Sequence, residues 1–562
     1  MSRRGQGIDR RTFLRRGLVA GAVAGTGAGV WAATESGGSH GPSGPPNILV
    51  IIVDQLRFPQ WYSPMAELPN IAALRRGAVS FERHYTASND CTPARAALLT
   101  GLYTHQTGCM VTGASTLDPG FPTWGRMLRE QGYSTWWYGK WHLTHGDRHW
   151  TATNGSRDLE RYGFGGGTFP SPNGAPGQGL RRDPFIARQF ADWFAEEGAS
   201  GPWCTTVSLI NPHDISWWYL WTDRIHGERL AEPEVTSLPP NFETPELLME
   251  RRKPRLQRSL QATSASAFGP VPFKGPRAQR LWLDFANLYV KLQRTADHQV
   301  GEVMRTLHSD PAVAANTVVV FTSDHGEYGG SHGLRGKGAA AYDEAIRVPL
   351  LVRDPRGVLT RSPHIPRRQL TSSVDIAPLL LTIAAGDGAW RRDGHYAHLA
   401  DRLDLTTLLR NPHAAGRNHI LHATDEILTE FAVQLYDAPL HIVAIRTAEA
   451  KYAIYSNWAP GAVEPLSAGE DSELYDYSTP GGRLEIENVA GRSPLEGALR
   501  SALETALDAE LAAPLPGHLT QAGVRGFNDY FETAKHDAVF AAHRRRQRAR
   551  KLLHHIVLPP IF

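Results

Sequence analysis

A chain of 562 residues can hold one large α/β domain and a smaller one, and its 41% hydrophobic and 20% charged residues are ordinary for a folded soluble protein. The net charge is +3, but the first 33 residues contribute +5, so the rest of the chain stands at −2 and gives no support to nucleic-acid binding. Three cysteines are too few for a disulfide framework, and we expect Cys109 and Cys204 to be small buried side chains.

The N-terminal segment has the pattern of an export signal. Asp9-Arg10-Arg11-Thr12-Phe13-Leu14-Arg15 is a twin-arginine pattern, and residues 17–33 are apolar and rich in Gly and Ala. This run falls short of the roughly 20 strongly apolar residues of a stable membrane span. We therefore predict a twin-arginine signal at 1–33, a linker at 34–46 and a periplasmic or extracellular protein. A disordered basic tail is the alternative.

The middle of the chain alternates between strands and helices. Apolar, mostly β-branched runs predict buried strands of a parallel sheet, and apolar residues at helical spacing predict helices. In chain order the predicted elements are a strand at 47–53, a helix from Pro69, a strand at 79–85, a helix from Cys91, a helix at 117–131, a strand at 133–138, a helix at 184–197, a strand at 205–210, a helix at 281–307 and a strand at 317–322. The predicted fold class is α/β, with a large, mostly parallel sheet flanked by helices.

Four of these strands end in polar residues that can bind ligands. They are followed by Asp54-Gln55, Gly139-Lys140-Trp141-His142, Asn211-Pro212-His213-Asp214 and Ser323-Asp324-His325-Gly326. Each set alone would be read as caps or turns, but open parallel sheets bind ligands at the carboxyl ends of their strands. Four together predict an active site. The oxygen and nitrogen donors there fit a divalent metal ion, with Asp54, Gln55, Asp324 and His325 as ligands.

The segment Cys91-Thr92-Pro93-Ala94-Arg95 predicts a turn that leads into a helix. Free N–H groups and the dipole at a helix N-terminus favour an anion, and Arg95 adds a positive charge. A buried cysteine on a loop is the alternative. The spacing Cys-x-Pro-x-Arg, with Leu-Thr-Gly behind it, resembles the signature of the type I sulfatases. In that family the cysteine is oxidised to formylglycine, whose aldehyde hydrate is the nucleophile.

Further motifs in the order of that family extend the resemblance from about residue 47 to about residue 490. Besides the four strand ends they are Leu68-Pro69-Asn70, Gly336-Lys337 and Arg347-Val348-Pro349. The resemblance implies an alkaline phosphatase-like fold in which the metal ligands are Asp54, Gln55, Cys91, Asp324 and His325. It also implies that Arg95 and Lys140 hold the nucleophile and the sulfate, that His142 is the base, and that His213 and Lys337 act at the leaving group.

The implied cofactors are one divalent metal ion and formylglycine made from Cys91. Ca²⁺ is the first expectation for the ion, with Mg²⁺ or Mn²⁺ as alternatives, and the implied partner is a formylglycine-generating enzyme. Many arylsulfatases have two adjacent aspartates where this chain has Asp54-Gln55, and asparagine at the place of His325. The pattern found here looks more like the choline sulfatase and phosphonate monoester hydrolase branches.

The C-terminal part is predicted to form separate units. We expect the catalytic domain at 47–410, an antiparallel α+β subdomain at 411–490 with short strands at 441–447, 451–455 and 473–476, and a helical extension at 491–562 with helices at 495–511 and 527–553. The apolar tail at 554–562 is expected to dock on the body of the protein or on a neighbouring subunit, which would make a homo-oligomer.

Two insertions have open interpretations. The aromatic segment at 217–221 either packs a loop or lines the mouth of the pocket, where rings could stack on a sugar or an aryl group or enclose a quaternary ammonium. The basic segment at 251–279 is read as a solvated loop, with a platform for an anionic substrate as the alternative.

The predicted function is hydrolysis of a small-molecule or sugar sulfate ester to an alcohol and sulfate. Cations around the transferring group and a proton donor at the leaving oxygen are what this reaction needs. Phosphonate or phosphate ester hydrolysis is the alternative within the same superfamily. An inactive anion-binding protein with an unmodified Cys91 is the alternative from another class.

Overall fold

The computed structural model describes residues 44–59, 68–112, 115–144, 155–220, 234–338, 340–425, 438–457 and 466–528. The expected export signal at 1–33, most of the linker and the tail at 554–562 lie outside these ranges, as does nearly all of the helix expected at 527–553. Within the described ranges, no helix combines the length and the apolar character needed to cross a bilayer.

Seven strands form one mostly parallel sheet in the order β2-β8-β7-β1-β6-β4-β5. Of these strands, β8 alone runs antiparallel to its neighbours, which are β2 and β7, and this agrees with the predicted fold class. The strands are β1 (Asn47–Val53), β2 (Val79–Phe81), β4 (Ser134–Gly139), β5 (Gly165–Gly166), β6 (Trp203–Leu209), β7 (Thr317–Thr322) and β8 (Leu350–Arg353). A separate pair is formed by β3 (His84–Tyr85) and β9 (Thr371–Ser372).

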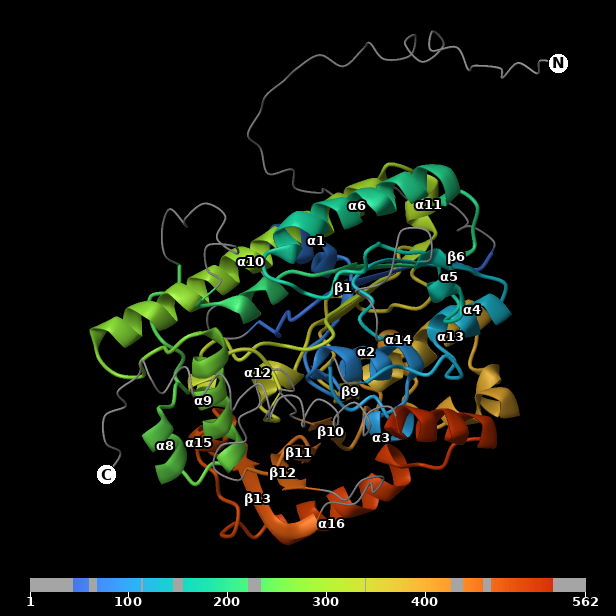
Figure 1. The fold of residues 1–562 in the computed structure, drawn as a ribbon. Coiled ribbons are helices and arrows are strands. Elements are labelled where there is room, and N and C mark those ends of the chain that lie inside the picture. Colours follow the sequence, from blue (N-terminus) through green and yellow to red (C-terminus); the bar gives the residue numbers. More distant parts are fainter. Residues whose placement is uncertain are drawn as a thin grey trace, which may run out of the picture. The chain divides into compact units, whose positions relative to one another are not determined.

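Helices cover both faces of this sheet (Figure 1). Alternate residues of β1 enter two different cores, because successive side chains of a strand point to opposite faces. Ile48, Val50 and Ile52 pack with α2, α4, α13 and α14, whereas Leu49, Ile51 and Val53 pack with α1, α6 and α10. The bounds of these helices are α1 (Pro69–Arg76), α2 (Cys91–Thr100), α4 (Trp124–Glu130), α6 (Gln178–Glu197), α10 (Pro276–His308), α13 (Ile376–Ala385) and α14 (Leu405–Arg410).

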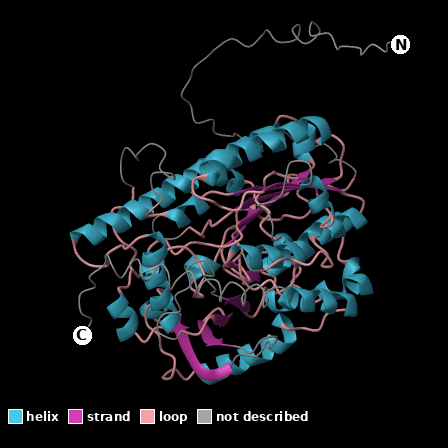
Figure 2. Cartoon of the chain, viewed as in Figure 1, coloured by secondary structure: helices cyan, strands magenta, loops and turns pink. Residues whose placement is uncertain are grey.

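A second, antiparallel sheet follows in the order β10-β11-β12-β13, as predicted for the C-terminal part (Figure 2). Its strands are β10 (Ile420–Asp425), β11 (His441–Arg446), β12 (Ala450–Asn457) and β13 (Leu466–Asp476). One face packs against α16 (Glu496–Ala506) and the other against α9 (Arg255–Phe268). Both faces are therefore apolar, which is why every residue of β11 is buried.

The remaining elements are short and connect these layers. They are α3 (Thr104–Thr107), α5 (Gly155–Glu160), α8 (Pro245–Glu250), α11 (Pro311–Ala315), α12 (Asp343–Ile346), α15 (Pro480–Arg483), the 3₁₀ turns η3 (His213–Trp217), η4 (Ser331–Gly333), η5 (Ser373–Asp375), η6 (Ala389–Arg392) and η7 (Gly394–Leu399), and the π turn η8 (Leu507–Leu511). Cys109 and Cys204 are both buried, which confirms that prediction.

Several predicted elements differ from the structure, among them α6, α10 and β13, which begin earlier than predicted, at Gln178, Pro276 and Leu466. The helix expected at 117–131 begins only at Trp124, because Pro119 and Pro122 interrupt the preceding turn. The strand expected at 79–85 is divided into β2 and β3. The segment at 251–279 is not a solvated loop, since α9 occupies its centre and Lys253 is only 6% exposed.

Candidate active site

Neighbouring strands bring the predicted polar residues to one edge of the sheet. β1 pairs in parallel with both β6 and β7, with Val53 opposite Leu209 and Ile52 opposite Thr322. β4 adds Gly139 opposite Ser208. The residues that follow these four strands leave the sheet at the same level, where Cys91 joins them from α2. Hydrogen bonds, ion pairs and charge interactions connect all ten predicted site residues, which are Asp54, Gln55, Cys91, Arg95, Lys140, His142, His213, Asp324, His325 and Lys337.

Cys91 is the first residue of α2. The side chain of Asp90 caps the helix, because its Oδ1 accepts a hydrogen bond from the backbone N–H of Cys91 at 2.9 Å and its Oδ2 accepts one from Thr112 at 3.0 Å. Every residue of α2 is buried, and Cys91 is 1% exposed. The sulfur therefore lies at a capped helix N-terminus inside the protein.

Two aspartates and a histidine surround this sulfur. The ligand atoms of Asp54, Cys91, Asp324 and His325 all lie within 4.8 Å of one another. His325 Nε2 is 3.2 Å from the sulfur, 3.7 Å from Asp54 Oδ1 and 3.8 Å from Asp324 Oδ1. Burial and the negative charge of Asp54 raise the pKa of Asp324.

Two buried cations hold the aspartates in place. Arg95 bridges them, with one nitrogen 2.9 Å from Asp54 Oδ2 and another 2.9 Å from Asp324 Oδ2. Lys140 Nζ lies 2.6 Å from Asp54 Oδ2 and 3.6 Å from the Cys91 sulfur. Although burial opposes the charged form, Lys140, Lys337 and His325 lower the pKa of Cys91 well below its usual value. The site is thus built to hold negative charge at residue 91.

A divalent cation fits these residues. Asp54 Oδ1 is buried and accepts no hydrogen bond, so it is a free oxygen ligand. Two carboxylates and an imidazole within bonding reach of one point are a common donor set for such ions. Gln55 adjoins them, since its backbone N–H donates to Asp324 Oδ1 at 3.1 Å.

Two other histidines lie near Cys91, since the side chains of His142 and His213 both interact with it. Burial, with the positive charges of Lys140 and Lys337, lowers the pKa of His213 to about 3, so its imidazole is neutral at pH 7. Gly174, at φ +84°, packs on the His213 ring, where an added Cβ would lie 2.5 Å from the ring carbon Cε1.

The sequence did not identify several residues that support the site. Glu327 accepts a hydrogen bond from Gln55 Nε2, and Ser216 donates one to Gln55 Oε1 at 3.0 Å. Tyr289 Oη donates to the backbone oxygen of Gln55 at 2.7 Å. Asp90, directly before Cys91, was recognisable as a typical N-cap residue, whereas Tyr289 lies 234 positions from Gln55 in a helix with no visible motif.

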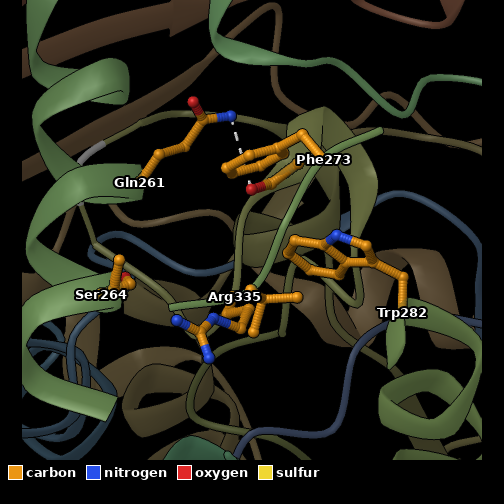
Figure 3. A pocket seen from close by; sticks show the side chains of 8 residues that line it. Gln261, Ser264, Phe273, Trp282 and Arg335 are labelled. Carbon is orange, nitrogen blue, oxygen red and sulfur yellow. Dashed lines mark hydrogen bonds between the residues drawn. The ribbon is translucent and has the colours of Figure 1, made fainter. Parts of the chain in front are cut away.

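The aromatic segment after His213 serves mainly for packing in its described part. Trp218 is 3% exposed and contacts Trp282 and Phe285, while Trp221 lies outside the described residues. A separate, water-sized cavity of about 10 Å³ is surrounded by Gln261, Ser264, Phe273, Trp282 and Arg335 (Figure 3), and none of residues 217–220 lines it.

The comparisons with known proteins cover most of the chain. The family model described as "Sulfatase" matches residues 46–386. A choline-sulfatase of Rhizobium meliloti is 27% identical over 497 residues, which are 82% of this chain and 86% of that protein. Arylsulfatase K of Mus musculus is 26% identical over 468 residues, 80% of this chain and 77% of that protein. A phosphonate monoester hydrolase of Silicibacter pomeroyi has a similar fold, with a TM-score of 0.61, 21% identity, and coverage of 82% of this chain and 94% of that one.

Proposed function

This chain belongs to the sulfatase family and is a sulfuric ester hydrolase, and we propose that it cleaves a sulfate monoester at residue 91 after oxidation of Cys91 to formylglycine. The observation that carries this proposal is the set of cations and metal-binding side chains that converge on one buried sulfur. A residue that only packs a core needs no such surroundings.

The proposed metal ligands are Asp54, Gln55, residue 91, Asp324 and His325. A divalent ion held there, which we propose to be Ca²⁺, would supply positive charge, and formylglycine would supply a nucleophilic oxygen as its hydrate. The protein itself holds the two carboxylates in place through Arg95 and Lys140, whose positive charges favour the ionised forms.

We assign the binding of the nucleophile and the sulfate to Arg95 and Lys140, and the leaving-group side of the transferring group to Lys337. The charges of Cys91 and Asp54 raise the pKa of Lys337 despite its burial, so it stays an ammonium. Fixed cations in a site without water stabilise charge that develops on the transferring group. The same cations favour a compact dianionic or monoanionic ester over a neutral one.

Proton transfer is assigned to the two histidines. We propose that His142 accepts a proton at residue 91 and that His213 gives one to the departing oxygen, which their interactions with Cys91 support. With a pKa of about 3, His213 carries no extra proton before substrate binds. An anionic ester beside the ring would raise that pKa, because an opposite charge favours the protonated form.

Phosphonate or phosphate ester hydrolysis is the second candidate. It is favoured by the Asp54-Gln55 and Asp324-His325 pairs, which differ from the ligand pairs of many arylsulfatases. Sulfate, phosphate and phosphonate esters with the same nitrophenol leaving group should be compared at equal pH. A higher kcat/KM for sulfate supports the first assignment, and a higher value for phosphonate contradicts it.

Mass spectrometry of the peptide that contains residue 91 tests the modification. We expect oxygen in place of sulfur in active protein that was made together with a formylglycine-generating enzyme. Full activity in protein that retains the sulfur would contradict the proposal. We also propose export by the twin-arginine route, for which a full-length precursor should accumulate in cells that lack that transporter.

A further inference from the structure

The Gln55 carboxamide lies between the carboxylate of Glu327 and the ammonium group of Lys337. Its Nε2 donates to Glu327 Oε2, and its Oε1 accepts from Lys337 Nζ at 2.8 Å and from Ser216 Oγ at 3.0 Å. Gln55 and Glu327 are both 0% exposed. Water therefore cannot replace a lost partner of this amide.

These partners allow only one orientation of the amide. An ionised carboxylate accepts hydrogen bonds but cannot donate them, whereas an ammonium donates but cannot accept. The amide nitrogen must face Glu327, and the amide oxygen must face Lys337. The backbone supports the same arrangement, since Gln55 is held at φ +66° and its N–H donates to Asp324 Oδ1.

Glu327 also shapes the loop that carries Lys337. Its second oxygen, Oε1, accepts hydrogen bonds from the backbone N–H of Gly329 at 3.1 Å and of Gly336 at 2.7 Å. Gly336 directly precedes Lys337. One buried carboxylate thus holds the segment after β1, the segment after β7 and the start of the Lys337 segment.

We infer that Glu327 is a positioning residue that turns the Gln55 oxygen toward Lys337 and the proposed metal ligands. The inference deepens the proposed function, because Gln55 serves as a ligand only in that assignment. Glu327 itself acts through Gln55 and through the Gly336 backbone.

The isosteric change Glu327→Gln tests this inference. With an amide at position 327, either its NH₂ group faces Gln55 Nε2 or it faces the N–H groups of Gly329 and Gly336. Both arrangements place donors against donors, and the first is relieved only if Gln55 flips. We expect the apparent Kd for Ca²⁺ or Mn²⁺, titrated into chelator-treated full-length protein, to rise about 10- to 100-fold, as is usual for partners that orient a metal ligand.

Exchanging the side chains at positions 55 and 327 should restore the match between hydrogen-bond donors and acceptors. In Gln55→Glu/Glu327→Gln, the amide at 327 donates to the carboxylate at 55, and its oxygen accepts from the two glycines. The other oxygen at position 55 then faces Lys337 and Ser216, as in the wild type. The double variant should bind the ion at least 5-fold more tightly than Glu327→Gln. Because a carboxylate at position 55 binds cations more strongly than an amide, the gain is compared with that of Gln55→Glu alone in the wild-type background. A merely structural role of Glu327 would make the two gains equal, whereas positioning through the shared hydrogen bond makes the gain larger in the Glu327→Gln background.

Glu473→Gln is the matched control. Glu473 is 0% exposed in β13 and accepts hydrogen bonds from Tyr455, Tyr475 and Gln257, so its loss should lower the melting temperature without changing the Kd. Wild-type affinity in Glu327→Gln, or no gain in the double variant, would overturn the inference. A wild type that binds the ion and shows the rescue but cleaves no sulfate ester would support it and contradict only the proposed function.

Discussion

At the scale of the residue, its surroundings distinguish Cys91 from another buried cysteine of the chain. The helix N-terminus, Lys140, Lys337 and His325 all favour negative charge at the side chain. The same groups would favour an anionic nucleophile and an anionic substrate after the oxidation proposed here. Cys204 provides the contrast, since burial without such neighbours raises its pKa.

Cys91→Ala and Cys91→Ser should lower kcat/KM for a sulfate ester by a factor of about 10⁴ or more, the scale for loss of a covalent nucleophile. Alanine cannot be oxidised to the aldehyde, and serine reaches it only through an enzyme that oxidises a hydroxyl instead of a thiol. Initial rates with nitrophenyl sulfate measure the effect, and Cys109→Ala, in an equally buried position, is the control that should stay within 10-fold of wild type. Comparable rates for the Cys91 and Cys109 variants would refute the assigned nucleophile.

His213→Ala should slow esters of poor leaving groups far more than esters of activated phenols. An alkyl sulfate releases a basic alkoxide that needs a proton, which is worth about 10²- to 10⁴-fold in rate, whereas nitrophenolate leaves without one. A series of sulfate esters with leaving groups of graded pKa measures the dependence. Equal losses across the series would rule out the acid role of His213.

At the scale of elements, two buried carboxylates join α6 to the turn that carries His213. Asp183 of α6 accepts hydrogen bonds from the backbone N–H of Ile210 at 2.7 Å and of Asn211 at 2.9 Å. The Asp214 carboxylate likewise accepts hydrogen bonds from the backbone N–H groups of Gly179 and Leu180, in the first turn of α6. The position of the His213 turn therefore depends on α6.

Asp183→Asn should lower the free energy of unfolding by about 1–3 kcal/mol, because an amide NH₂ would face a buried backbone N–H. Urea denaturation measures this change. Asp310→Asn is a matched control, since Asp310 also accepts from two backbone N–H groups but at the exposed start of α11. A loss at Asp183 no larger than the loss at Asp310 would contradict the role of burial.

Long, regular elements were predictable from the sequence, and side-chain networks between them were not. The β1 and β7 runs are β-branched and buried on both faces, so their extent and their polar ends were visible without coordinates. β2 and β3 were merged into one strand because two-to-three-residue strands carry no periodicity. Glu327 was missed because its partner, Gln55, is 272 residues away and no local pattern connects them.

At the scale of the whole molecule, ion pairs join the C-terminal elements to the catalytic domain. Glu510 in η8 lies 3.1 Å from Arg417 and 2.8 Å from His419. Arg417 also pairs with Asp375, next to α13, at 2.6 Å. Burial opposes its charge, but His419 and Arg417 lower the pKa of Glu510 to about 2.

Glu510→Gln should destabilise the protein by about 2 kcal/mol at pH 7. Because the folded-state pKa is depressed, the stabilisation is complete above the unfolded value of 4.5 and disappears as the pH falls through about 2. Urea unfolding between pH 7 and pH 2 should show the gap between wild type and variant closing only below about 4.5. Glu504 is 59% exposed and forms an ion pair with Arg500. Glu504→Gln should therefore change the free energy of unfolding by less than about 0.5 kcal/mol. A pH-independent gap for Glu510→Gln would contradict this account.

The burial of α2 determines whether the proposed oxidation of Cys91 could take place before or after folding. Another protein cannot reach a side chain that is 1% exposed, so a catalyst of the oxidation proposed here would have to meet the polypeptide before it folds. Protein that folds without that encounter would keep its thiol permanently. The fraction of active molecules in a preparation would then depend on how many chains were oxidised before they folded. Adding the oxidising enzyme to purified, folded protein would not increase that fraction.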